Sequence, residues 1–252
     1  MSESSAPIAP GTPPASEVKA GLLQNLIDVY FSPGEAFARI ARRPAWILPA
    51  VGYLVLGIAF TAVWMNKMDP HEFMKAQLEQ SPQAAKMTAE QREQVVEQQA
   101  KLMPILIPVI GIAGLVISIV VVAGGLLFVY RFFYGAELAF VQSLAISSWV
   151  FFATSLVTTP LLLLVFALKG DWNLNPQELL QANLTLILDR TTAAKPLWTL
   201  LSGIDLFSIW AVFLLAIGYA AAVRRSLGSA IWGVAVPWLL IVLAKVAWAS
   251  IF

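Results

Sequence analysis

The sequence of 252 residues has no cysteine, a single histidine and few charged side chains. Without cysteine there is no disulfide framework, no thiolate metal site and no cysteine nucleophile. The one histidine, His71, excludes sites that need several imidazole ligands, and we expect it to be a solvated side chain in a polar loop. Lysine and arginine total 16 against 15 acids, so the charge gives no case for a nucleic-acid partner.

Motifs that carry chemistry are also missing. The sequence contains no glycine-rich phosphate loop, no His-Glu-x-x-His and no Gly-x-Ser-x-Gly. It therefore predicts no catalytic residue, no cofactor-binding residue, no metal ligand and no cofactor. We expect a protein that is not an enzyme.

Charge is scarce because long stretches carry none. Hydrophobic residues make up 59% of the chain and charged residues 12%, whereas soluble domains are about 45–50% apolar and about 25% charged. Since a helix needs about 20 apolar residues to cross a bilayer, the pattern predicts five spans, at about 46–65, 105–130, 138–168, 206–223 and 226–252. The third run is longer than a bilayer requires, so it either tilts or begins at the interface.

The expected fold class is therefore an all-α membrane protein, a five-helix transmembrane bundle with short amphipathic interfacial helices. Residues 1–19 are polar and rich in Ser, Pro and Ala, which predicts a disordered N-terminal tail. Residues 20–252 form the membrane domain, with outer loops at 66–104 and 169–205.

Helix ends can be predicted at several positions. Thr88 and Gln91 resemble a capping box, which predicts a helix that leads into the second span with a bend at Pro104 and Pro108. Asp205, together with Ser202, is expected to cap the fourth span.

Two short amphipathic segments precede the first span. Residues 20–31 carry an apolar helical stripe, and Ser32 then caps a second helix that ends near Pro44. Both are too short to cross a membrane, so we expect them on its cytoplasmic face. Packing against the end of the bundle is an alternative that is compatible with this location. The candidate membrane-surface or partner contacts are Arg39, Arg42 and Arg43.

The orientation follows from arginines that lie next to the spans. Arg131, Arg224 and Arg225 fall on the same side as the basic N-terminal segment. The bases of the outer loops are more dispersed and are diluted by acids. We therefore expect the N-terminus in the cytoplasm and the C-terminus on the opposite side.

Few polar groups lie inside the predicted spans. Lys245 is the one charge within a span, seven residues from the C-terminus, where its ammonium can snorkel to the interface. Ser147, Thr154 and Thr158 recur at helical spacing in the third span and could share a face. These four residues are the candidate intramembrane polar site. Snorkelling of Lys245, or a structural pair, is the favoured reading over transport.

Two stretches carry a family resemblance. The first is Tyr30-Phe31-Ser32-Pro33-Gly34-Glu35-Ala36-Phe37-Ala38-Arg39-Ile40, followed by Pro44-Ala45-Trp46, and the second is Ile204-Asp205-Leu206-Phe207-Ser208-Ile209-Trp210, followed by Gly218. With these motifs and five spans, residues 20–252 resemble the Yip family of multi-span membrane proteins, in its bacterial type. The founding eukaryotic members interact with Ypt/Rab GTPases and are linked to vesicle trafficking and membrane shaping. The resemblance implies no catalytic residues and favours a bacterial inner membrane.

The sequence thus leads to a non-enzymatic membrane organiser, scaffold or partner-binding protein. Its expected partners are the lipid bilayer and also other membrane proteins or further copies of the chain. A small transporter or permease component is the alternative, with Lys245 and the polar residues of the third span as its path.

Overall fold

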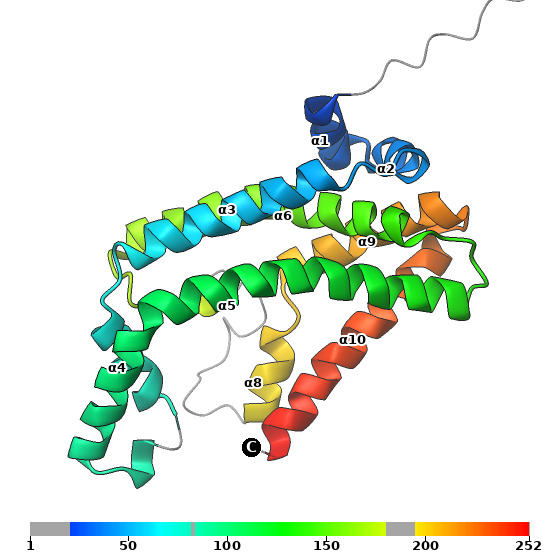
Figure 1. Ribbon diagram of the computed structural model, residues 1–252. Helices are drawn as coiled ribbons and strands as arrows, with labels where there is room; N and C mark the ends of the chain where they lie inside the picture. The colour runs from blue at the N-terminus through cyan, green and yellow to red at the C-terminus, as the bar shows by residue number, and fades with distance from the viewer. Residues whose placement is uncertain (1–20, 82–83, 180–194, 252) are drawn as a thin grey trace, which may run out of the picture.

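The computed structural model describes residues 21–81, 84–179 and 195–251, and within these ranges the regular structure is helical (Figure 1). The predicted all-α bundle is therefore confirmed. The predicted tail, residues 1–19, and much of the predicted outer loop 169–205 lie outside the described residues.

Five described helices are long and apolar enough to cross a membrane. These are α3 (Ile47–Met65), α5 (Ala89–Phe132), α6 (Phe140–Lys169), α9 (Leu206–Val223) and α10 (Leu227–Ile251). The shorter elements are α1 (Leu22–Phe31), α2 (Pro33–Arg42), α4 (Pro70–Glu79), the 3-10 turn η1 (Ala84–Lys86), α7 (Pro176–Leu179) and α8 (Lys195–Ser202).

Three parts of the chain that carry or adjoin the arginines predicted to lie on one side of the membrane meet at one end of the bundle. The pair α1–α2, the connection from α5 to α6 and the connection from α9 to α10 meet there (Figure 1). We call this the head end. The turn from α3 into α4 lies at the opposite, distal end, and α8 packs beside α10.

Helix α6 extends beyond α3 at the head end. The 19 residues of α3 make a helix of about 28 Å, close to the roughly 30 Å of bilayer hydrocarbon. The indole of Trp149 in α6 donates a hydrogen bond of 3.2 Å to the carbonyl of Ala45, just before α3 begins. The first turns of α6, from Phe140 to Trp149, therefore project beyond α3 by about 13 Å. The excess length of this helix therefore lies at the head end.

Helix α5 is longer than its predicted span because it starts in the predicted outer loop. Thr88 and Gln91 form the expected capping box, with bonds of 2.9 and 3.2 Å. The helix then continues without a break through Pro104 and Pro108 and changes direction in its first half (Figure 1). Both prolines remove a backbone donor, which explains a bend without a break.

The distal end has its own small core. Trp64, Met68, Met103 and Phe166 are buried together, and the Trp64 indole donates to the carbonyl of Trp172 at 2.9 Å. The Nε2 atom of His71 in α4 lies 3.0 Å from a carboxylate oxygen of Glu93 in α5. This contact joins α4 to α5, and the imidazole is 39% exposed.

Candidate functional site

Helix α2 is built into the head end. Phe37 is fully buried and packs between α6 and α9. Gly218 of α9 makes room for it, since a Cβ there would lie 3.2 Å from Cδ1 of Phe37 and 2.5 Å from Cγ2 of Ile146. The amide of Gln142 also donates to the carbonyl of Ala41 at 2.9 Å. The apolar face of α2 therefore contacts protein, as the packing alternative expects.

Helix α1 packs against α6 further from the head end than α2 does. Val29 is fully buried, and the Tyr30 hydroxyl donates a bond of 2.6 Å to the carbonyl of Ala153 in α6. The Tyr30 ring also stacks on Trp210 of α9, with 6.0 Å between centroids. Burial raises the pKa of the Tyr30 phenol, so it remains a donor. Because Ala153 lies one turn past Trp149, the end of α1 is level with the first turns of α3.

The opposite side of α1 is apolar and uncovered. Leu23, Ile27 and Phe31 follow one another at intervals of four residues and are 69%, 44% and 82% exposed. Side chains at this spacing share one helix face. That face is level with the first turns of α3 and is not covered by the described part of the bundle. We call Leu23, Ile27 and Phe31 the α1 stripe.

The three predicted contact arginines have different surroundings. Arg39 forms an ion pair with Asp28 and donates to the side chain of Asn25 at 3.3 Å, so it fastens α2 to α1. Arg42 and Arg43 are exposed at the end of α2. These two remain the candidate contacts with head groups.

We expect the pair of Arg39 and Asp28 to keep α1 closed onto α2. The ion pair is half-buried, so removing one charge leaves the other poorly solvated. In Arg39→Gln or Asp28→Asn, amide hydrogen exchange in α1 should quicken about tenfold, which corresponds to about 1.4 kcal/mol. The double variant should exchange no faster than the single ones. If each single variant exchanges like the wild type, the pair does not hold α1.

A polar cluster inside the head end was missed by the sequence reasoning. Tyr219 of α9 shares a hydrogen bond with Ser143 of α6, whose hydroxyl donates to the carbonyl of Ala123 at 2.6 Å. The Tyr130 ring stacks on Tyr219 with 4.6 Å between centroids, and its hydroxyl donates to the carbonyl of Ala230 at 2.8 Å. The cluster joins α5, α6, α9 and α10. Tyrosines near span ends were the available signal, but pairing across helices is not visible in one sequence.

The four residues of the predicted intramembrane polar site lie on two helices, three on α6 and one on α10. Ser147 is fully buried in α6, and the Thr154 hydroxyl donates to the carbonyl of Val150 at 2.9 Å. Thr158 is half-buried on the same helix. Lys245 is exposed on α10, which packs mainly on α9 and α8. The structure does not gather Lys245 with the hydroxyls of α6.

Among the residues that the structure describes, no three side chains of His, Asp or Glu come together in a way that could hold a metal ion. The hydrogen bonds of the serine and tyrosine hydroxyls described above join them to one another and to backbone carbonyls, and not to an acidic or basic side chain. What the head end offers is a docked helix pair with an apolar stripe and two exposed arginines.

Comparisons with known proteins give one match. The model of the Yip1 domain family matches residues 27–249. That stretch begins within α1 and ends within α10, so it includes the head end and all five apolar helices. The family resemblance that the sequence motifs indicate is thereby confirmed. No curated protein and no solved structure matches the chain.

Proposed function

Because this chain belongs to the Yip1 domain family and is an integral membrane protein with five apolar helices, we propose that it is a non-enzymatic membrane organiser that acts by inserting α1 into one leaflet. The observation that carries the proposal is the bond from Tyr30 to Ala153. It fixes α1 at the level of the first turns of α3 while the α1 stripe faces away from the protein.

A helix held at this depth changes the leaflet around it. The ten residues of α1 make a cylinder about 15 Å long and about 10 Å wide, which adds area on the order of 150 Å² to one leaflet. The other leaflet gains no matching area from this element, so the bilayer is favoured to bend. Since α1 is already ordered by the bundle, insertion does not require it to fold at the membrane.

Charge at the end of α2 supports the same arrangement. Arg42 in the last turn of α2 and Arg43 directly after it are exposed. A basic side chain near an anionic surface contributes about 1 kcal/mol to membrane binding. Arg131, Arg224 and Arg225 also belong to the head end. On this basis we place the head end and the N-terminus in the cytoplasm of a bacterial cell, and the C-terminus across its inner membrane.

The test is vesicle remodelling by the purified full-length protein. Reconstituted into liposomes with an anionic lipid fraction, the wild type should reduce the mean vesicle diameter as its density rises. The variant Leu23→Gln, Ile27→Gln, Phe31→Gln should leave the diameter at the value of protein-free liposomes, because its stripe no longer partitions into acyl chains. Electron cryomicroscopy measures both distributions.

A matched control changes exposed apolar residues elsewhere at the head end. Phe133→Gln and Phe140→Gln replace side chains that are 69% and 43% exposed, outside α1. This variant should remodel vesicles like the wild type. Remodelling by the stripe variant at wild-type strength, or none by the wild type, contradicts the proposal.

The transporter hypothesis stays a prediction with its own measurement. It requires a path that uses Lys245 together with Ser147, Thr154 and Thr158. Solute uptake by vesicles that hold the wild-type protein, and its loss in the Lys245→Leu variant, would support this hypothesis. Uptake by wild-type vesicles at the same rate as by protein-free vesicles would contradict it.

A further inference from the structure

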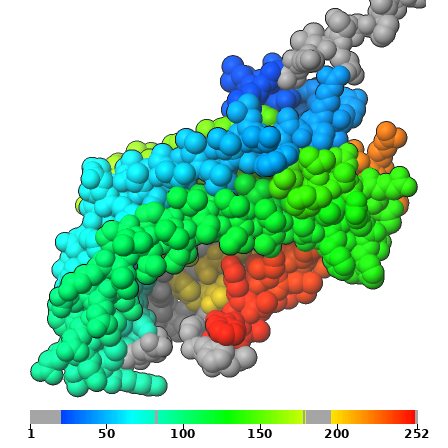
Figure 2. Space-filling view, viewed as in Figure 1, coloured from blue at the N-terminus to red at the C-terminus, as the bar shows by residue number. Residues whose placement is uncertain are grey.

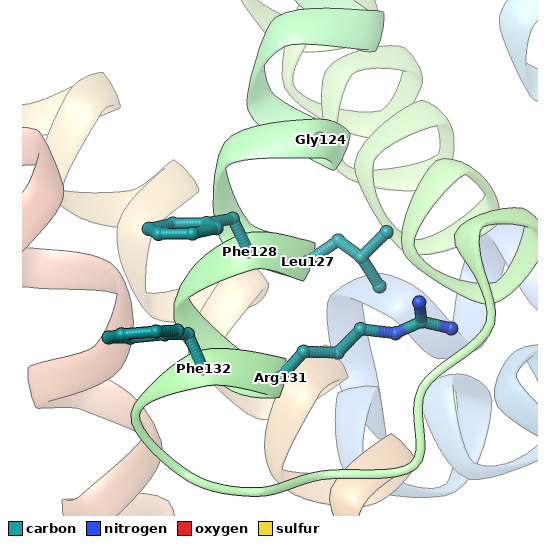
Figure 3. Close-up of a pocket in the computed structure, with 5 residues that line it drawn as sticks. All are labelled: Gly124, Leu127, Phe128, Arg131 and Phe132. Atoms are coloured by element: carbon teal, nitrogen blue, oxygen red, sulfur yellow. The ribbon is translucent and has the colours of Figure 1, made fainter.

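Helix α5 lies at the surface of the bundle (Figure 2). At the head end it carries a shallow groove lined by its own residues (Figure 3). Its volume is about 440 Å³. The residues that line it, in order along the helix, are Gly124, Leu127, Phe128, Arg131 and Phe132.

Side chains border the groove on two sides, and the backbone at Gly124 is open between them. Phe128 and Phe132 project to one side of α5, with their rings stacked 5.3 Å apart, while Leu127 and Arg131 project to the other (Figure 3). Gly124 lies at the start of the groove, where a Cβ would meet no atom within 4 Å. An apolar chain can therefore lie against the backbone at Gly124 with side chains on both flanks.

Arg131 supplies a fixed cation at the other end of the groove. Its Nε donates to the carbonyl of Leu138 at 2.8 Å, which orients the guanidinium. Within the described part of the chain, no hydrogen bond or ion pair occupies its two terminal nitrogens. A planar guanidinium with two free donors on one edge matches the geometry of a phosphate ester.

The depth of the groove agrees with a lipid that spans from acyl chain to phosphate. Helix α5 carries no charged residue between Lys101 and Arg131. An uncharged apolar run of this length has bilayer hydrocarbon as its solvent, so Gly124, near the end of the run, lies at acyl-chain depth. Arg131 follows about 10 Å further along the helix, and its side chain leans back toward the membrane as helical side chains do.

We propose that this groove binds one anionic phospholipid from the leaflet at the head end, with its phosphate on Arg131 and an acyl chain over Gly124 between Leu127 and Phe128. The site lies on α5, apart from the α1 stripe, and does not depend on α1 entering the bilayer. It goes beyond the proposed function because it gives the protein a preference for a lipid class.

Native mass spectrometry of the full-length protein in mild detergent tests the site. With added phosphatidylglycerol, the wild type should retain one lipid more tightly than the rest. Arg131→Gln should weaken that first binding step about fivefold, the effect of removing one basic side chain near an anionic group. Lys101→Gln removes one exposed basic side chain from the distal part of the same helix and should leave the first step unchanged.

A second variant tests the contact with the acyl chain separately from the contact with the phosphate. Gly124→Leu fills the floor of the groove while Arg131 stays in place, and the open space around Gly124 lets the fold accept it. It should weaken the first binding step to a similar extent, with an unchanged thermal unfolding curve. Wild-type affinity in either Arg131→Gln or Gly124→Leu overturns the proposal.

Discussion

Replacing Phe37 by alanine is expected to lower the free energy of unfolding by about 3–5 kcal/mol and to release α2 from the bundle. The side chain is fully buried between α6 and α9. Its truncation removes buried apolar contacts and leaves a cavity between these helices. Equilibrium unfolding in mixed micelles, followed by circular dichroism, measures the loss.

The matched control is Phe31→Ala, because the two phenylalanines are six residues apart and differ in burial. Phe31 is 82% exposed on α1, so its replacement should change the free energy of unfolding by less than about 0.5 kcal/mol. Phe31→Ala should instead weaken vesicle remodelling. Equal destabilisation by both variants would mean that α2 is not docked through Phe37.

Gly218→Val is expected to destabilise the same contact from the other side, by about 1–3 kcal/mol. A Cβ at Gly218 would lie 2.5 Å from Cγ2 of Ile146, a methyl on a branched and fully buried side chain that cannot rotate away. The same unfolding measurement applies. Adding Ile146→Ala removes the colliding methyl, so the double variant should be more stable than the sum of the two single changes predicts.

Gly125→Val provides the comparison on a neighbouring helix. A Cβ at Gly125 in α5 would meet no atom within 4 Å, so this change adds the same side chain without a collision. It should leave stability within about 0.5 kcal/mol of the wild type. Similar losses at Gly125 and Gly218 would show that valine in a helix, and not the contact with Phe37, sets the cost.

The apolar helices were predictable because charge-free runs of this length have lipid as their solvent. What one sequence could not separate was lipid from protein as the neighbour of an apolar side chain. Phe37 and Phe31 are chemically identical and close in sequence, yet one is buried and the other is 82% exposed. The space for the Phe37 ring depends on Gly218, more than 180 residues later in the chain.

Local capping signals were predicted with mixed success. Asp205 caps α9 as expected, with its carboxylate accepting from the amides of Phe207 and Ser208. Ser202 does not take part, since its hydroxyl donates to the carbonyl of Thr199. Ser32 occupies the first position before α2 but makes no capping bond with its side chain. A carboxylate binds two amides strongly, whereas a hydroxyl is easily drawn to a nearby carbonyl.

Because the chain has no cysteine, single cysteines can be introduced and labelled to measure the depth of α1 in the bilayer. A nitroxide on Phe31→Cys, in the reconstituted protein, can be compared with one on Arg42→Cys by power saturation with oxygen and with a polar nickel chelate. We predict that the label at residue 31 is accessible to oxygen and shielded from nickel, and that the label at residue 42 is open to nickel. Equal access of nickel to both positions would contradict the insertion of α1.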